Sequence, residues 1–379
     1  MWSGLVPSRS ALDQVERRIR GEYGAEAVLL TASGTVALAL AFLASAKPGE
    51  RPRVVLPAWG CYDLMTAADA VDAEVVLYDI DPETLSPSRD SFERALRPGA
   101  SFSPHAAVVA HWFGIPVDLA RPSETARSAG VFLIDDAAQG VGGSLGGKPL
   151  GTGGDFGILS FGRGKGRTGG GGGVLLAHRP DAVERMRAIE HRLERPRGGL
   201  GGYAALWAQW ALGRPALYGI PSSLPFLKLG ETLYRQPPPL RTMPYRAAAV
   251  LGATWDPSRE EADRRRALAR LWQDRLAQVP GIASITTGPP GDPGWLRYPV
   301  VADHRVAAAL ASSTAARLGV VRAYPATMSA LPVSPRRLRG VPERFPGAEQ
   351  LSMGLFTLPL HRYVTSNALE AVIQLMKMG

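Results

Sequence analysis

The chain has 379 residues, of which 45% are hydrophobic and 20% are charged, so it can bury a large core and its length predicts two domains. Its formal net charge of +9 comes from Lys and Arg residues spread along the chain, which favours attraction to a small anionic substrate over a nucleic-acid interface. The single cysteine excludes an internal disulfide and a multi-cysteine metal site, the histidines show no zinc spacing, and we expect no metal, no signal peptide, no membrane span and a cytoplasmic location.

Short apolar segments alternate with helical segments in the first half, which is typical of a mostly parallel sheet covered on both faces. The predicted strands are residues 53–57, 74–78, 107–111, 131–134, 156–161 and 173–177, and helices are predicted at 36–46 and 89–96. Because the 36–46 segment is apolar on all sides, we expect that helix to be buried.

The pattern changes after about residue 247. A long Arg-rich helix at 257–277 is expected to link two domains, followed by a strand at 295–301, a helix at 305–318, a strand at 319–324 and a helix at 366–377. We therefore predict a large α/β domain at 1–246 and a smaller α/β domain at 247–379. Segment 199–229, where aromatics alternate with prolines, is atypical and is either a packed surface loop or a part of the site entrance or a subunit interface.

Three segments carry polar groups suited to binding an anion and a ring. Ser33-Gly34-Thr35 opens the buried helix, either as an ordinary N-cap or as an anion site at a helix N-terminus. Asp135 and Asp136 end an apolar strand, where open α/β sheets place ligands, and Gln139 follows three residues on. A carboxylate there can pair with a protonated ring nitrogen, while a solvated acid at a helix cap is the other interpretation.

Lys165 lies in a glycine-rich loop between two predicted strands, after Ser160. Glycines remove side-chain bulk, so a bound aldehyde could approach the lysine closely, and the cations of Arg163 and Arg167 would help to deprotonate its amine. A basic surface loop is the alternative. The turn 57–62 contains Trp59, Cys61 and Tyr62, where an aromatic could stack on a planar ring or simply pack in the core.

In this order, the segments resemble the DegT/DnrJ/StrS family of fold-type I aminotransferases, which use pyridoxal 5′-phosphate (PLP) to make amino sugars and amino-cyclitols. The resemblance covers most of the chain and rests on Ser33-Gly34-Thr35, AHWFGIPVD at 110–118, DDAAQ at 135–139, Ser160-Phe161 with Lys165, FPGAE at 345–349 and LPL at 358–360. It implies an α/β fold of the PLP-dependent transferase type I, with a mostly parallel sheet in a large domain and a smaller C-terminal α/β domain.

The resemblance also implies roles for single residues. Lys165 would form a Schiff base with PLP and move protons, Asp136 would keep the pyridine nitrogen protonated, and Gln139 would face the phenolic oxygen. The phosphate would be bound by Ser33, Gly34, Thr35 and Ser160.

Three departures from the family pattern bear on the substrate. The family's ring-stacking aromatic is matched by Cys61, so the stacking group is absent or displaced to Tyr62 or Trp59. The glycine run 169–173 lacks the family's glutamate. The family's Asn-Tyr-Arg segment, whose asparagine reaches the neighbouring subunit's phosphate, is matched by Pro239-Leu240-Arg241, which leaves Arg241 as the retained cofactor contact.

By resemblance, the protein would be a homodimer with shared active sites. It would move an amino group from glutamate or glutamine to a keto sugar, a cyclitol or a related natural-product intermediate. Two alternatives stay open from the sequence: a PLP enzyme of the same fold that catalyses elimination, epimerisation or carbon–carbon bond chemistry, and a non-catalytic relative. Retention of Lys165, Asp136 and Gln139 together argues against the second alternative.

Overall fold

The computed structural model describes residues 9–97, 99, 102–195, 233–286, 291–339 and 344–378, so the atypical segment 199–229 lies outside the described residues. The strands of the largest sheet are β1 (Ala27–Thr31), β2 (Arg53–Pro57), β3 (Glu74–Tyr78), β4 (Ala106–Ala110), β5 (Phe132–Asp136), β8 (Phe156–Ser160) and β9 (Gly173–Ala177). Each strand predicted in the first half is present, with ends that differ by at most a residue or two.

The order in this seven-stranded sheet is β1-β9-β8-β5-β4-β2-β3. Neighbours from β3 to β8 are parallel, whereas β9 runs antiparallel to both β8 and β1. The carboxyl ends of β2, β4, β5 and β8 therefore meet at one edge of the sheet. Successive strands are added in opposite directions on either side of the β2–β4 pair, which creates the crevice where open α/β sheets bind ligands.

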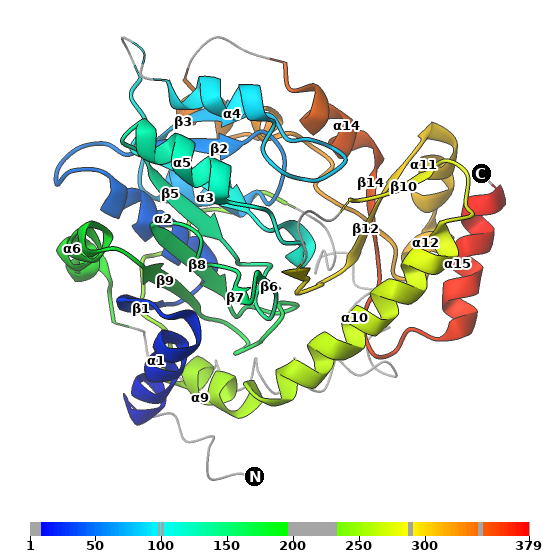
Figure 1. Cartoon of the computed structure of the whole chain (residues 1–379), viewed down its shortest axis with the longest axis horizontal. Coiled ribbons are helices and arrows are strands. Elements are labelled where there is room, and N and C mark those ends of the chain that lie inside the picture. The colour runs from blue at the N-terminus through cyan, green and yellow to red at the C-terminus, as the bar shows by residue number, and fades with distance from the viewer. Residues whose placement is uncertain are drawn as a thin grey trace.

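Helices cover the large sheet and extend into a second region (Figure 1). They are α1 (Arg9–Tyr23), α2 (Gly34–Ser45), α3 (Asp63–Ala70), α4 (Arg89–Leu96), α5 (Ala120–Ser128), α6 (Pro180–Ile189), α9 (Tyr245–Thr254), α10 (Pro257–Leu276), α11 (His304–Leu310), α12 (Ser313–Arg317), α13 (Ser334–Arg337), α14 (Pro346–Gly354) and α15 (Ser366–Met378), with 3-10 turns η1 (Trp112–Gly114), η2 (Glu190–Arg192) and η4 (Met328–Ala330). As predicted, α2 is buried on all sides, and Ser33 caps its N-terminus.

The second region is built on an antiparallel sheet with the order β10-β12-β14-β13. Its strands are β10 (Ile282–Ser284), β12 (Tyr298–Ala302), β13 (Val321–Arg322) and β14 (Leu355–Leu358), and a small third sheet pairs β11 (Gly291–Asp292), β6 (Ser144–Leu145) and β7 (Lys148–Pro149). Helix α10 lies where a long helix was predicted and runs from the large sheet to this region (Figure 1).

Two predictions for the second half are corrected. The helix expected at 305–318 is divided into α11 and α12, because the Ser312 side chain accepts a hydrogen bond from Ala315 N and caps a new helix there. The strand expected at 319–324 is limited to Val321–Arg322, since Tyr324 takes a positive φ of 42° that ends the extended conformation.

The predicted boundary at 246/247 falls inside α9, which packs against α1 beside the large sheet. Met243, Ala247, Leu251 and Trp255 share one apolar cluster with Ile19 of α1. The first residues of the expected smaller domain thus lie with the large sheet, and the division into two domains stays a prediction.

Candidate active site

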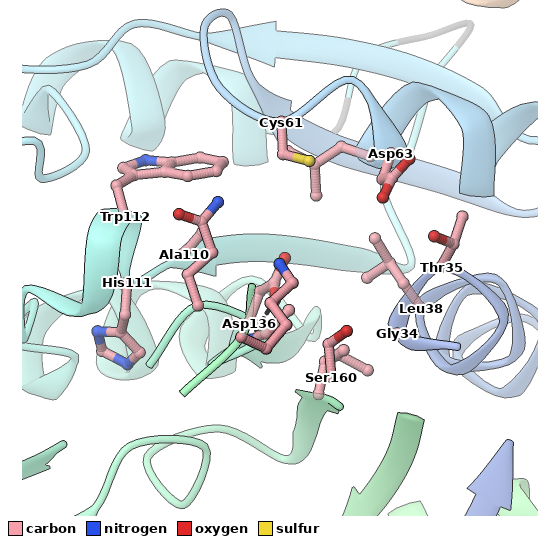
Figure 2. Close-up of a pocket in the computed structure, with 15 residues that line it drawn as sticks. Gly34, Thr35, Leu38, Cys61, Asp63, Ala110, His111, Trp112, Asp136 and Ser160 are labelled. Carbon is pink, nitrogen blue, oxygen red and sulfur yellow. Dashed lines mark hydrogen bonds between the residues drawn. The ribbon is translucent and has the colours of Figure 1, made fainter. Parts of the chain in front are cut away.

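A pocket opens at the carboxyl edge of the large sheet, beside the N-terminus of α2 (Figure 2). Its lining residues come from segments far apart in the sequence: Gly34, Thr35, Leu38, Cys61, Asp63, Leu64, Ala110, His111, Trp112, Asp136, Ala138, Gln139, Ile158, Ser160 and Lys165. Seven of the ten residues predicted to bind or act with a cofactor are among them. Ser33, Tyr62 and Arg241 are not among the lining residues.

Asp136 ends β5 with its carboxylate facing the pocket, below Cys61 in Figure 2. The side chain is 8% exposed, and its Oδ1 accepts a hydrogen bond from Ala138 N at 2.9 Å. Burial raises the pKa of Asp136 to about 6, while the Ala138 amide and the Lys165 ammonium act to lower it. The protein's own donors and cations thus do not offset the cost of burying this carboxylate, and a cation in the pocket would stabilise its ionised form.

The preceding residue, Asp135, points away from the pocket, with two hydrogen bonds to Oδ2 and a close but poorly aligned contact of Oδ1 with the His111 ring. Its Oδ2 accepts hydrogen bonds from Gly151 N at 3.0 Å and Gly153 N at 2.9 Å, and its Oδ1 lies 2.8 Å from His111 Nε2. Because Val117 N donates to His111 Nδ1 at 2.9 Å, the ring proton is on Nε2, facing the carboxylate. Asp135 therefore fixes the end of β5 and the orientation of the His111 ring.

The opposite end of the pocket is suited to an anion. Ser33 Oγ accepts a hydrogen bond from Val36 N at 3.2 Å and so caps α2. The amides of Gly34 and Thr35 belong to the first turn, where backbone N–H groups have no acceptor within the helix. A Cβ at Gly34 would lie 2.8 Å from the Ser160 Cβ, so only glycine lets the helix end approach the end of β8 so closely. The positive end of the α2 dipole and the Ser160 side chain thus meet at one point.

The last glycine of the run after the lysine loop, Gly173, has a steric cause. A Cβ at Gly173 would lie 2.3 Å from the Ser33 carbonyl carbon, because β9 begins directly beside the start of α2. This contact explains a glycine where strand β9 passes the anion-binding end of the pocket.

Lys165 lies in the turn between β8 and β9, and its side chain reaches the pocket. Its backbone N–H donates to Gly162 O at 3.3 Å, and Thr168 Oγ1 donates to Gly162 O at 3.3 Å, so the loop folds back on itself. The expected influence of the neighbouring arginines on the Lys165 amine stays a prediction. Arg163 is exposed, and the buried Arg167 pairs with Glu22 at 2.6 Å and lies over the Trp255 ring.

Cys61, rather than a neighbouring aromatic, faces the pocket from the turn after β2 (Figure 2). Burial raises the pKa of the Cys61 thiol to about 12, so it stays protonated near neutral pH. Trp59 Nε1 donates to Tyr324 O at 3.0 Å, and the Tyr62 hydroxyl accepts from Ala326 N at 2.9 Å. Both of these rings pack against Tyr324 instead of lining the pocket.

Arg241 takes no part in the pocket within this chain. Its Nε lies 3.4 Å from Glu194 Oε2, and its carbonyl accepts from Ala32 N at 2.8 Å, just before the α2 cap. Arg241 thus approaches the anion-binding end of the pocket through its backbone carbonyl and not through its guanidinium.

Three lining residues, Asp63, His111 and Trp112, and Tyr324, which binds Gln139 from behind the pocket lining, had no predicted role. His111 and Trp112 follow β4, and the rule that pointed to Asp136 at the end of β5 applies to them equally. Tyr324 enters from the second region of the chain, and no local pattern marks it.

Among the described residues, no group of three or more His, Cys, Asp or Glu side chains is placed to hold a metal ion. In the same part of the chain, no helix combines the length and the apolar character needed to cross a membrane.

Known proteins share this architecture. A solved structure titled aminotransferase TlmJ from Streptoalloteichus hindustanus is 25% identical, with a TM-score of 0.73, over 99% of this chain and 92% of that one. The Escherichia coli GDP-4-keto-6-deoxy-D-mannose-3-dehydratase with bound hydrated PLP is 15% identical, with a TM-score of 0.73 over 97% of this chain and 92% of that one. The fold is therefore the PLP-dependent transferase fold that the sequence predicted.

Curated relatives match at the level of sequence. A dTDP-4-dehydro-2,3,6-trideoxy-D-glucose 4-aminotransferase of Saccharopolyspora spinosa is 32% identical over 52% of this chain and 50% of its own length. An L-glutamine:2-deoxy-scyllo-inosose aminotransferase of Streptomyces kanamyceticus is 33% identical over 50% of this chain and 44% of its own. The chain spans about half the length of the curated relatives it matches.

A model of one protein family matches residues 3–196 and 242–377, which is most of the chain and includes every residue that lines the pocket. The chain belongs to the DegT/DnrJ/EryC1/StrS aminotransferase family.

Proposed function

We propose that this protein is a PLP-dependent aminotransferase, and the observation that carries the proposal is the buried, cation-deficient Asp136 carboxylate facing Lys165 across one pocket. Among the groups of PLP that a protein can recognise are a phosphate, a basic ring nitrogen and an aldehyde. The pocket offers a partner of matching chemistry for each of them.

The donor set fits the cofactor group by group. A protonated ring nitrogen would supply Asp136 with the positive charge that burial makes favourable. The first-turn amides of Gly34 and Thr35 with the Ser160 hydroxyl would bind the phosphate at the end of α2. An amine on a glycine-flanked loop, Lys165, completes the set.

Each side chain then has a defined task. The bound cofactor supplies an electron sink for bond breaking next to the transferred amino group. Asp136 keeps a proton on the ring nitrogen, which makes that sink effective. Lys165 Nζ holds the cofactor between turnovers and moves a proton to and from the substrate carbon. The uncharged Cys61 thiol covers the pocket and does not compete with Lys165 for the proton that is moved.

The substrate class follows from relatives. We infer an amino donor of the glutamate or glutamine type and a keto sugar, cyclitol or related polyol as acceptor, because the relatives' names specify a deoxy-sugar and a scyllo-inosose. We further propose a homodimer with shared active sites in the cytoplasm. Arg241, which lies beside the phosphate end without lining the pocket, is then a candidate for contact in the assembled dimer.

A second candidate is a PLP reaction other than transamination, such as elimination, epimerisation or carbon–carbon bond chemistry. The observation that favours it is a dehydratase with the same fold among the solved structures. The small Cys61 side chain at the pocket roof is compatible with either reaction.

The test begins with the absorbance spectrum of the protein reconstituted with PLP. We expect a visible band that borohydride abolishes, with the cofactor then attached covalently to the peptide that contains Lys165. Lys165→Ala should lose the band and the attachment, whereas Lys148→Ala, an exposed lysine on β7, should keep both. Circular dichroism establishes that each variant is folded. A wild-type protein without the band, or a band that survives in Lys165→Ala, contradicts the proposal.

Adding glutamate or glutamine then separates the two candidates. Transamination predicts that one of these donors converts the visible band to the absorbance of the amine form of the cofactor, with release of the donor's keto acid. If the band persists with every common amino donor, the non-transaminating reaction is favoured instead.

A further inference from the structure

The Gln139 amide is held at both of its ends by protein groups. Its Oε1 accepts a hydrogen bond from Phe113 N at 3.0 Å, and its Nε2 donates to the Tyr324 hydroxyl at 2.8 Å. An unrestrained amide could present either oxygen or nitrogen to the pocket. Here the oxygen is occupied by the Phe113 amide, so nitrogen is the end that remains, and one of its two hydrogens is free.

The two residues that hold Gln139 have an uncommon backbone conformation. Phe113 has φ 56° and Tyr324 has φ 42°, in the left-handed region that residues other than glycine rarely adopt. Their rings stack, with centroids 6.2 Å apart and planes 24° apart. Such conformations persist only where the surroundings impose them, and they concentrate at functional sites.

Tyr324 comes from the second region and is fixed there by contacts with the first. Trp59 Nε1 donates to its carbonyl at 3.0 Å, and the rings of Trp59, Tyr62 and Trp112 pack around it. Burial holds the pKa of the Tyr324 hydroxyl well above its ordinary value, and the Cys61 thiol lies within hydrogen-bonding range of it. The hydroxyl therefore stays protonated and accepts a hydrogen bond from Gln139.

We propose that Tyr324 is a positioning residue that orients the Gln139 amide so that its second N–H donates to the phenolic oxygen of bound PLP. The inference rests on the proposed cofactor. It gives the second region of the chain a direct part in the cofactor site, since the hydroxyl of Tyr324 decides which atom of Gln139 faces the ring.

The consequence is measurable in the holoenzyme. A donor to the phenolic oxygen stabilises its anion and so weakens proton binding at the adjoining lysine-linked nitrogen. Loss of an aligned hydrogen bond should therefore raise the pH midpoint of the visible band. The other titratable groups around the pocket are Cys61, Asp63, His111, Asp136 and Lys165, and they are identical in the variants compared.

The experiment is a double-mutant cycle of Tyr324→Phe and Gln139→Leu, read by spectrophotometric pH titration of the holoenzyme. Tyr324→Phe keeps the ring packing and removes the hydroxyl, and we expect it to tighten proton binding about threefold to tenfold. Gln139→Leu should have an equal or larger effect. In the Gln139→Leu background, Tyr324→Phe should add little, because the proposed effect of the hydroxyl on the cofactor passes through the amide.

Tyr298→Phe is the matched control. Its hydroxyl is also largely buried and contacts Ser284 Oγ at 3.3 Å, away from the residues that line the pocket. We expect its midpoint to equal that of the wild type.

The outcomes are distinct. An unchanged midpoint in Tyr324→Phe, or an equal shift of the midpoint in the presence and absence of Gln139, overturns the positioning role. If Tyr324→Phe does not fold, a crystal structure of the wild-type holoenzyme provides the test. The positioning role is also overturned if Gln139 Nε2 lies out of hydrogen-bond reach of the Tyr324 hydroxyl or of the phenolic oxygen of PLP. A wild-type protein with no visible band contradicts the proposed function, whereas a normal wild-type titration with an unaffected variant contradicts this inference alone.

Discussion

Asp135 and Asp136 are adjacent, identical in type and both buried, yet they face opposite sides of the sheet at the end of β5. On the Asp135 side, two backbone amides and the His111 ring surround the carboxylate. On the Asp136 side, one backbone amide donates, and burial raises the pKa to about 6. The first environment suits a structural anchor, and the second suits a group that awaits a cationic ligand.

Residue type and burial do not by themselves define a catalytic carboxylate. The distinguishing feature is whether the protein itself supplies enough hydrogen-bond donors or positive charge to the carboxylate. An ionised carboxylate that accepts hydrogen bonds on all sides stabilises the fold. A carboxylate with few donors lowers the stability of the ligand-free protein and makes the binding of a cationic ligand more favourable.

The largest effect is expected at the structural carboxylate. Asp135→Asn places an amide NH2 against the donors of Gly151, Gly153 or His111, so at least one buried hydrogen-bonding group loses its partner. We expect the free energy of unfolding to fall by about 3–5 kcal/mol, as measured by urea denaturation followed by circular dichroism. Asp13→Asn, at an exposed position on α1, provides the control. A loss below about 1 kcal/mol would show that Asp135 is no anchor.

The opposite sign is expected at Asp136 in the cofactor-free protein. Because the folded-state pKa is raised from 3.8 to about 6, the stabilising contribution of this carboxyl is complete at acid pH and is lost as the pH rises through about 6. Asp136→Asn has no proton to lose. Above about pH 7 it should be more stable than the wild type by up to about 3 kcal/mol, and the difference should vanish near pH 4.

Denaturation across pH with and without PLP measures this. Saturating PLP should favour the wild type over Asp136→Asn, since the ionised carboxylate then has its cation. If Asp136→Asn were less stable than the wild type at neutral pH without PLP, the carboxylate would be satisfied by the protein, and the contrast with Asp135 would fail.

The smallest effect is expected at His111, which contacts both sides, since it pairs with Asp135 and lines the pocket. His111→Gln can still approach the carboxylate with an N–H, so we expect a loss of stability of about 1–2 kcal/mol. Its affinity for PLP, measured by titration of the visible band, should change less than in Asp136→Asn. A larger loss of PLP affinity than of stability would place His111 with the cofactor rather than with the anchor.

Much of the site was predictable because its parts are short, local patterns. The strands at 53–57, 74–78 and 173–177 were predicted with their observed bounds. Strand-end carboxylates, a small-residue helix start and a glycine-flanked lysine pointed to Asp136, Gly34 and Lys165, and the structure brings these three together in one pocket. The order of these motifs also identified the family.

Other features could not be predicted because they depend on long-range contacts. Which of Cys61, Tyr62 and Trp59 faces the pocket was decided by Tyr324, which comes from a distant segment and binds the other two. The capping side chain of Ser312 indicates the break between α11 and α12, but the continuous apolar periodicity of 305–318 predicted one helix.

The sequence by itself determined the fold class and the kinds of group gathered at the carboxyl edge, because strand and helix periodicity and the glycine positions are local properties of the chain. Only the tertiary structure decided which groups are satisfied. Asp135 and Asp136 look alike in the sequence, and they differ because the pleat turns successive side chains to opposite faces of the sheet. There, one carboxylate meets the amides of Gly151 and Gly153, 16 and 18 residues further along the chain, and the other meets an open pocket.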